Sequence, residues 1–380
     1  MSDSSSVRKP QFEPGDILGD WEVIRKLGSG GYGMVVEVLS KTGVRAACKA
    51  EFVAGNSSQM LQKEVPVLQA MQGTHHFCRL YMAGKIVFND QPLNIMVMTL
   101  VGKPLSEKRR ECPDKRYSRS TAIRLGMQCL EAIRDLHHNG YIHRDVKGGN
   151  FAWNEVDRSV YLLDYGFARQ YLIWEDSTCQ KLIHRAPRKS AHFLGTGRYA
   201  SVNVHLRRDQ GRRDDMWSFL YMLVEFVVGR LPWSNDDSDR LIGVKKGKCG
   251  SKLLNHCPVE MYKLYDHIRS LGVTSRPNYD YLMRVLQSIC QRCGYNEADP
   301  FDFEPGGRHY EYIVNEQKTH EARLARQLAA AERADDDQGC STGTDDALGV
   351  GTEPYDESGP LGDHLSYDYT RSMSTRPQSL

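Results

Sequence analysis

The sequence YIHRDVKGGN at residues 141–150, followed after thirteen residues by DYG at residues 164–166, decides the fold and chemistry predicted for this chain. Asp145, Asn150 and Asp164 are its most informative side chains. A carboxylate such as Asp145 can orient a hydroxyl group and accept its proton. The other two offer oxygen ligands of the kind that Mg²⁺ prefers beside phosphates. The spacing therefore predicts phosphoryl transfer, with one base and two metal ligands.

Lys147 can neutralise the negative charge that builds on a transferred phosphoryl group. Taken singly, these residues have plainer interpretations. His143 could be a core histidine, and residues 164–166 could form an ordinary turn. The two segments in this order, after the glycine-rich loop and the lysine described next, favour the functional interpretation.

A glycine-rich stretch, GSGGYGMV at residues 28–35, precedes these motifs. It separates alternating apolar positions at residues 21–27 and 34–38, which predicts a β-hairpin. Where side chains are missing, backbone N–H groups can approach triphosphate oxygens. A plain hairpin turn is the alternative. A dinucleotide-binding loop would need a helix directly after the glycines, and residues 34–38 indicate a strand instead.

Residues 46–49, AACK, predict a strand that ends in one lysine, whose ammonium could bind the α- and β-phosphates of a nucleotide. The alternative is a surface lysine with its stem along apolar groups. Glu64, in the polar and apolar pattern of residues 57–71, could pair with Lys49 and hold it at the phosphates. Pro66 is expected to kink this segment, because proline removes one helical hydrogen bond.

The chain divides into a strand-rich first part and a helical second part. Residues 120–138 carry apolar side chains at helical spacing, with Asn139 and Gly140 as a stop signal. Residues 216–228 are apolar almost all round, which predicts a helix buried inside a larger lobe.

The 380 residues are 40% apolar and 26% charged, enough for one large core or two smaller ones. The longest nearly apolar run, residues 219–229, is shorter than the roughly 20 residues of a membrane helix. Residues 1–10 lack the pattern of a secretion signal. Ten irregularly spaced cysteines favour free thiols over a zinc site. We therefore expect no membrane span and a cytoplasmic protein, with the nucleus as a second compartment.

Charge is distributed unevenly along the chain. Ten acidic and two basic residues follow Ala334, so subtraction from the whole-chain net charge of +2 leaves about +10 on residues 1–334. A basic body could meet nucleic acid, a membrane surface or acidic protein segments, and charge alone does not choose among them.

Together, these motifs resemble the eukaryotic protein kinases over residues 21 to about 303. GTGRYASVN at residues 195–203 is similar to the G-T-x-R-Y-A-S-[IV]-N of the casein kinase 1 superfamily. Four further segments look like its tau-tubulin kinase branch: RDDMWS at 213–218, YMLVEF at 221–226, LPW at 231–233 and DPFDF at 299–303.

The resemblance implies an α+β, bilobal protein-kinase fold. A strand-rich N-lobe is expected at about residues 21–98 and a helical C-lobe at about 103–303. We expect a polar leader at residues 1–20, a helical extension at 304–334 and an acidic disordered tail at 335–380.

The resemblance also implies ATP and Mg²⁺ as cofactors, with Asn150 and Asp164 as metal ligands. Met98 takes the gatekeeper position, and Leu100 and Val101 belong to the hinge that holds adenine. The predicted ATP contacts are Leu27, Gly28, Ser29, Gly30, Gly31, Tyr32, Gly33, Val35, Ala47, Lys49, Glu64, Met98, Leu100 and Val101.

The catalytic residues implied are Asp145, Lys147, Lys49 and Thr196, with Thr196 supporting Asp145. Asp215 would brace the catalytic loop, and the side chains of Leu68, His143 and Tyr165 would stack as a spine between the lobes. Lys147 beside Asp145 is the serine/threonine-type pattern. A basic pocket for acidic or phosphorylated substrates would use Arg198 with Lys245, Lys246 or Lys248; a solvated lysine face is the alternative for the last three.

The leading hypothesis is a monomeric serine/threonine kinase that acts on protein substrates and binds neither nucleic acid nor membrane. A pseudokinase that binds ATP or partners without turnover is the second hypothesis, favoured by Pro66 and by Gly148-Gly149 in the catalytic loop. A nucleic-acid-binding module is the third and rests only on the basic body.

Overall fold

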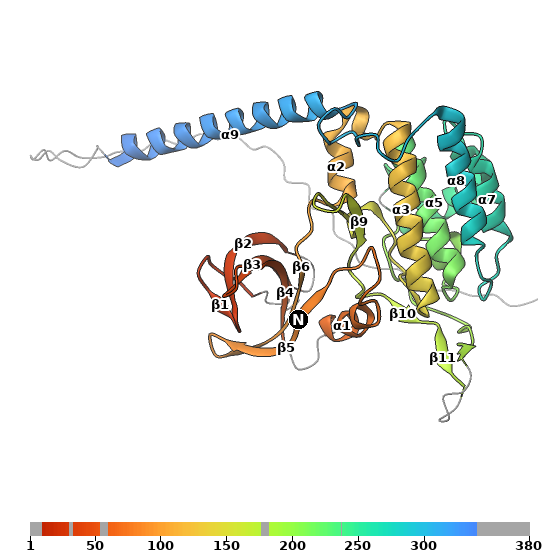
Figure 1. Cartoon of the computed structure of the whole chain (residues 1–380), viewed down its shortest axis with the longest axis horizontal. Helices are drawn as coiled ribbons and strands as arrows, with labels where there is room; N and C mark the ends of the chain where they lie inside the picture. The colour runs from red at the N-terminus through yellow and green to blue at the C-terminus, as the bar shows by residue number, and fades with distance from the viewer. Residues whose placement is uncertain (1–9, 30–32, 54–59, 176–181, 237, 340–380) are drawn as a thin grey trace, which may run out of the picture. The chain divides into compact units, whose positions relative to one another are not determined.

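The computed structural model describes residues 10–29, 33–53, 60–175, 182–236 and 238–339, with side chains up to residue 327 (Figure 1). The chain forms two compact units, Met1–Glu321 and Ala322–Leu380. Gly30, Gly31 and Tyr32, predicted to contact ATP, lie outside the described residues.

The first part of the chain forms a six-stranded antiparallel sheet in the order β1-β2-β3-β4-β6-β5. Its strands are β1 (Ile17–Leu18), β2 (Trp21–Ser29), β3 (Met34–Ser40), β4 (Arg45–Phe52), β5 (Leu80–Phe88) and β6 (Gln91–Thr99). The predicted hairpin is confirmed as β2 and β3. Helix α1 (Leu61–Ala70) follows β4 along the chain.

The two faces of this sheet have different environments. Val36, Cys48 and Val97 lie opposite one another on β3, β4 and β6 and are fully buried in a separate apolar core. Because side chains alternate along a strand, Val35 and Lys49 share the other face. That second face is where the nucleotide-binding residues were predicted.

The second part is helical. Helices α2 (Leu105–Glu111), α3 (Arg119–His138), α4 (Val202–His205), α5 (Arg212–Val228), α6 (Asp239–Cys249), α7 (Met261–Ser270) and α8 (Tyr279–Cys293) form it, with 3₁₀ turns η1 (Pro113–Lys115), η2 (Gly148–Asn150) and η3 (Gly250–Leu254). Short two-stranded sheets pair β7 (Tyr141–Ile142) with β10 (Arg169–Gln170), β8 (Phe151–Asn154) with β9 (Ser159–Leu162), and β11 (Leu172–Trp174) with β12 (Leu182–His184).

Helices α3 and α5 form the centre of this region and pack against each other (Figure 1). Helix α5 is buried on nearly all sides, as its continuous apolar sequence predicts. The hydroxyl of Ser118 caps α3 by accepting a hydrogen bond from Thr121 N at 3.2 Å. The predicted α+β fold with a strand-rich sheet and a helical region is confirmed.

The predicted leader at residues 1–20 is partly wrong. Phe12 and Leu18 are buried in the core of the sheet, and Phe12 stacks edge-on against Phe88. Phe12 and the pair Ile17-Leu18 are too few apolar positions to show the alternation that predicts a strand. Helix α9 (Tyr310–Gly339) begins in the predicted extension and continues past Ala334. No helix among the described residues is long and apolar enough to cross a membrane.

Candidate active site

Asp215, near the start of α5, fixes the backbone of the catalytic loop. Its Oδ2 accepts a hydrogen bond from His143 N at 2.7 Å and its Oδ1 accepts one from Arg144 N at 2.8 Å. Arg144 has φ +68°, a left-handed conformation that costs energy in a non-glycine residue. His137 Nε2 lies 2.9 Å from Asp215 Oδ2. Burial alone would raise the pKa of Asp215, but these hydrogen bonds lower it.

The carboxylate of Asp145 is held from both sides. Its Oδ1 accepts hydrogen bonds from Thr196 N at 2.8 Å and Thr196 Oγ1 at 2.7 Å. Lys147 Nζ lies 2.6 Å from Asp145 Oδ2 and 2.9 Å from Thr196 Oγ1. Asn150 Nδ2 donates to the backbone oxygen of Asp145 at 2.9 Å. The predicted catalytic residues on the helical region therefore meet at one carboxylate.

Gly195 makes this meeting possible. It has φ +108°, and a Cβ at this position would lie 2.5 Å from the backbone oxygen of Arg144. Only glycine allows the segment that ends at Thr196 to approach the catalytic loop so closely.

Lys49 connects the sheet to the helical region. Its Nζ lies 2.5 Å from Glu64 Oε1 and 3.7 Å from Asp164 Oδ1. Burial lowers the pKa of Lys49, but the attraction of Glu64 and Asp164 outweighs it, so the net shift is upward. The predicted pair forms although α1 contains Pro66, and the helix stays continuous over Leu61–Ala70.

Asp164 projects toward solvent from a left-handed backbone. Its φ is +61° and its side chain is 49% exposed. Burial alone would raise the pKa of Asp164, but Lys49 and nearby positive groups lower it. A largely ionised, accessible carboxylate beside Lys49 suits a metal ligand.

Glu51 is a positioning residue that the sequence analysis missed. Its carboxylate accepts hydrogen bonds from Met60 N and Leu61 N, both at 3.1 Å, at the start of α1. It lies two residues after Lys49 on the same face of β4 and is 4% exposed. Helix α1 has no side-chain cap of its own, so Glu51 supplies one from the sheet. The signal available in the sequence was a second charged residue, Glu51, two positions after Lys49.

We expect Glu51→Gln to lower the free energy of unfolding by about 1.5–3 kcal/mol, because a charged acceptor of two buried N–H groups is lost. The start of α1 should loosen, and the KM for ATP should rise because Glu64 no longer fixes Lys49. Thermal unfolding and ATP titrations would measure both effects. Glu22→Gln, at an exposed position on β2, is the control. An unchanged KM in a destabilised Glu51→Gln variant would contradict the positioning role.

The predicted spine is present in part. The rings of His143 and Tyr165 lie 5.9 Å apart, and Tyr165 stacks on Phe77 at 6.1 Å. Leu68 is fully buried in the same apolar core. Phe77, which the sequence analysis did not name, extends this ring stack inside the same apolar core.

Several of the residues predicted to contact ATP lie at paired positions on neighbouring strands of the sheet. Gly28 lies opposite Val35, Val35 opposite Lys49, and Ala47 opposite Met98. Directly opposed residues point to the same face, so these side chains share one surface. The other predicted residues lie in or beside these strands. Leu27 is exposed on β2, Ser29 ends β2, Gly33 precedes β3, and Leu100 and Val101 follow β6.

The cations of the predicted anion pocket do not act as one group in the structure. Arg198 donates to Ser234 O at 2.9 Å, and its guanidinium lies 3.6 Å from Glu225. Lys245 pairs with Asp236 at 2.8 Å, whereas Lys248 is exposed.

Lys246, which belongs to the same lysine run, is buried, and its contacts are with other groups of the protein. It donates to Gly197 O at 2.8 Å and Ala200 O at 2.5 Å, between the rings of Tyr221 and Trp233. Burial lowers the pKa of Lys246 to about 6, and its side-chain nitrogen fixes the backbone next to Thr196. It is too enclosed to receive a substrate anion.

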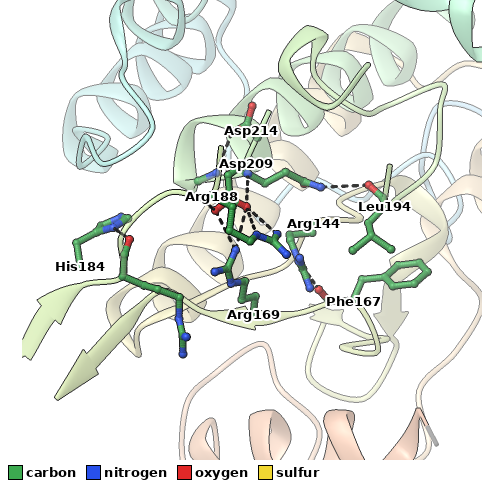
Figure 2. A network of polar contacts seen from close by, with 11 residues as sticks. Arg144, Phe167, Arg169, His184, Arg188, Leu194, Asp209 and Asp214 are labelled. Atoms are coloured by element: carbon green, nitrogen blue, oxygen red, sulfur yellow. Dashed lines mark hydrogen bonds and ion pairs between the residues drawn. The ribbon is translucent and has the colours of Figure 1, made fainter. Parts of the chain in front are cut away.

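A second cluster of arginines gathers around Asp209 (Figure 2). Arg169 Nη1 donates to Asp209 at 2.9 Å, and Arg188 donates through its guanidinium at 2.7 Å and its backbone N–H at 2.9 Å. Burial alone would raise the pKa of Asp209, but these two arginines lower it to about 2. Arg144 Nε donates to Phe167 O at 2.6 Å, and burial followed by the charges of Arg169 and Arg188 lowers the pKa of Arg144 to about 10.

Asp209→Asn should lower the free energy of unfolding by about 1–3 kcal/mol, because two arginines lose their shared anion. The segment around Arg188 should become more sensitive to limited proteolysis. The stabilisation that Asp209 gives the folded state through its lowered pKa is complete above about pH 4 and is lost as the pH falls toward 2. Asp157→Asn, at an exposed site, is the control. Equal proteolysis rates for the two variants at pH 7 would contradict this role.

The donor set fits magnesium and ATP. The amide nitrogen of Asn150 is used by Asp145, which leaves the Asn150 carbonyl oxygen as a ligand, and Asp164 adds an accessible carboxylate. Mg²⁺ typically takes one or two protein ligands and completes its shell with phosphates and water. Lys49, held by Glu64, is the matching phosphate contact.

A family model for the protein kinase domain matches residues 21–288. The chain belongs to the protein kinase family. Its fold and family are those of an ATP-dependent protein kinase. The chain is 37% identical over 302 residues to a probable serine/threonine-protein kinase of Dictyostelium discoideum, covering 77% of this chain and 58% of that relative. The matched part of this chain thus spans little more than half of that relative.

Two further relatives show the breadth of the similarity. A probable casein kinase I homolog of Encephalitozoon cuniculi is 31% identical over 290 residues, covering 74% of this chain and 92% of the relative. An inactive tau-tubulin kinase of Caenorhabditis elegans is 35% identical over 238 residues, covering 60% of this chain and 80% of the relative. The kinase resemblance is confirmed at the level of the family.

Proposed function

We propose that this kinase is an active serine/threonine-protein kinase of the casein kinase 1 superfamily, closest to the tau-tubulin kinase branch. It transfers the γ-phosphoryl group of ATP to serine or threonine hydroxyls of proteins. The observation that carries the proposal is the fixed carboxylate of Asp145, bound by Thr196 on one oxygen and by Lys147 on the other.

In the proposed reaction, Asp145 orients the substrate hydroxyl and accepts its proton. A bond forms between the hydroxyl oxygen and the γ-phosphorus, the bond from that phosphorus to the β–γ bridging oxygen breaks, and ADP leaves. Lys147 faces the developing negative charge, and Lys49 holds the α- and β-phosphates. Mg²⁺, held by Asn150 and Asp164, would neutralise phosphate charge when bound.

A pseudokinase is the competing function, and one relative is named inactive. Against it, every catalytic side chain predicted from the motifs is present and Lys49 is paired with Glu64. Gly148 packs tightly, since a Cβ there would lie 3.0 Å from the ring of Phe226, so this glycine need not loosen the loop. Transfer of phosphate from ATP to casein with Mg²⁺ tests the proposal. Magnesium-dependent ATP binding without any transfer would favour the pseudokinase.

We further propose that acidic or already phosphorylated substrates are preferred. The basic body and Arg198, whose side chain is 42% exposed near Thr196, support this preference. Matched serine peptides with glutamate, phosphoserine or alanine near the acceptor should show a higher kcat/KM for the two anionic peptides, by roughly tenfold. Equal kcat/KM for all three would contradict the preference and leave the kinase activity itself intact.

A further inference from the structure

A cavity of about 1410 Å³ lies in the helical region, apart from the residues of the candidate active site. Its lining comes mainly from three stretches: residues 113–120 between α2 and α3, residues 227–235 at the end of α5, and residues 295–309 after α8. We call it the basic groove, for the charges described below.

Hydrogen bonds between distant segments hold the walls of the basic groove together. Tyr117 N donates to Phe226 O at 3.0 Å, which ties the first stretch to the end of α5. Ser118 N donates to Asp302 Oδ2 at 2.6 Å, and Asp302 N donates to Thr121 Oγ1 at 3.0 Å. The groove is therefore a preformed feature of the fold.

Five exposed cationic side chains line the groove: Lys115, Arg116, Arg119, Arg230 and Arg308. One of them, Arg116, pairs with Asp114 at 3.3 Å. The other four make no ion pair with any residue in the described part of the chain. Most other arginines around the active site are neutralised, as Arg169 and Arg188 are by Asp209.

The three acidic side chains of the groove, Asp114, Asp299 and Asp302, offset only part of the charge of its five cationic side chains. Asp302 is 1% exposed and accepts the bond from Ser118 N, and Asp299 accepts one from Asn296 N at 2.9 Å. Like charges gathered without counter-ions repel one another, so an anionic ligand would be favoured here.

Apolar groups also line the groove, among them Val227, Val228, Tyr295 and Pro300. Cations alone would suit any small anion. Cations beside apolar surface suit a length of polypeptide, whose acidic side chains meet the arginines while its other side chains meet the apolar lining.

The groove is connected to the site of phosphate transfer. Arg230 begins the segment that contains Trp233 and Ser234. Trp233 Nε1 donates to the backbone oxygen of Arg198 at 2.8 Å, and the Arg198 guanidinium donates to Ser234 O at 2.9 Å. Arg198 lies two residues after Thr196, which holds Asp145. The wall of the groove is therefore linked by hydrogen bonds to the segment that positions Asp145.

We propose that the basic groove binds an acidic segment of protein substrates, remote from the residue that is phosphorylated. This proposal rests on the proposed kinase function and deepens it by assigning a docking surface. Binding of the acidic segment would raise the local concentration of the acceptor at Asp145, lowering KM with little effect on kcat.

The first test measures binding without catalysis. A fluorescent ten-residue peptide of glutamate and aspartate, without serine or threonine, is titrated with the full chain and with Arg119→Glu/Arg230→Glu. Lys263→Glu/Arg284→Glu is the control, since it makes the same charge change at exposed positions on α7 and α8. We expect roughly fivefold to tenfold weaker binding for the groove variant and no change beyond about twofold for the control. Equal loss in both would overturn the proposal.

The second test measures phosphate transfer to a short serine peptide and to the same peptide extended by the acidic segment. We expect the extension to lower KM by roughly fivefold to tenfold in the native chain and in the control, and not in the groove variant. Transfer to the short peptide should be unchanged in all three. Equal KM for both peptides in the native chain would overturn the groove proposal while the kinase function stands.

The two proposals can fail separately. Absence of any transfer, together with charge-dependent binding of the acidic peptide, would overturn the kinase function and retain the groove as an acidic-peptide site. If the groove variant instead loses binding to an RNA oligonucleotide or to phosphatidylserine vesicles, and the acidic peptide does not bind the native chain, the proposed occupant is wrong. Matching thermal unfolding curves would show that both double variants are folded.

Discussion

Asp145→Asn should lower kcat for phosphate transfer by about 10²- to 10⁴-fold, the usual contribution of a positioned acid or base. Asparagine has nearly the same shape as aspartate and can still accept hydrogen bonds from Thr196 through its amide oxygen. It cannot accept the proton of the substrate hydroxyl. The loss should therefore appear in kcat, with the KM for ATP nearly unchanged, because Asp145 makes its main contribution in the transition state.

Steady-state transfer of labelled phosphate to casein, with the product residues identified by mass spectrometry, would measure this effect. Asp266→Asn, at an exposed position on α7, is the control. If both variants kept the rate of the native chain, Asp145 would not be the base. A native chain with no activity would instead support the pseudokinase.

Asp164→Asn should reduce kcat by roughly 10²-fold and raise the Mg²⁺ concentration needed for half-maximal rate by about tenfold or more. An amide oxygen binds Mg²⁺ less strongly than a carboxylate, and the attraction between residue 164 and Lys49 is also lost. The backbone should stay in place, because asparagine tolerates the positive φ of +61° at this position better than most residues.

Asp90→Asn is the matched control for this second substitution. Asp90 also has a positive φ, +58°, but lies exposed in the turn between β5 and β6. Rates measured over a series of Mg²⁺ concentrations would separate a metal effect from a folding effect. An unchanged Mg²⁺ dependence in Asp164→Asn would show that Asp164 is not a magnesium ligand.

Local sequence was informative where the structure depends on neighbouring residues. The alternating pattern around the glycines predicted β2 and β3, and the apolar periodicity of residues 120–138 predicted α3 within one residue at its start. The burial of the leader is not predicted because Phe12 stands alone and Ile17-Leu18 is one apolar pair in a polar stretch. Only the packed sheet shows that Phe12 and Leu18 are buried.

Partners far apart in the chain were harder to predict. Asp209 is 40 residues from Arg169 and 21 from Arg188, and no motif joins them. The groove likewise combines segments from three parts of the chain. The proposed pocket around Arg198 and Lys245 stays a prediction, because a sequence shows where cations occur and leaves their counter-ions unknown.

The sequence by itself determined the kinase family and the α+β fold, and it supplied the residues that we propose for catalysis. Those depend on residue types at fixed spacing along short segments, which the chemistry of phosphate transfer restricts closely. Only the tertiary structure decided which charges are neutralised and which remain free. The electrostatic effect of a charged group depends on its distance from other charges and on its exposure to water. Both are set when distant segments pack together.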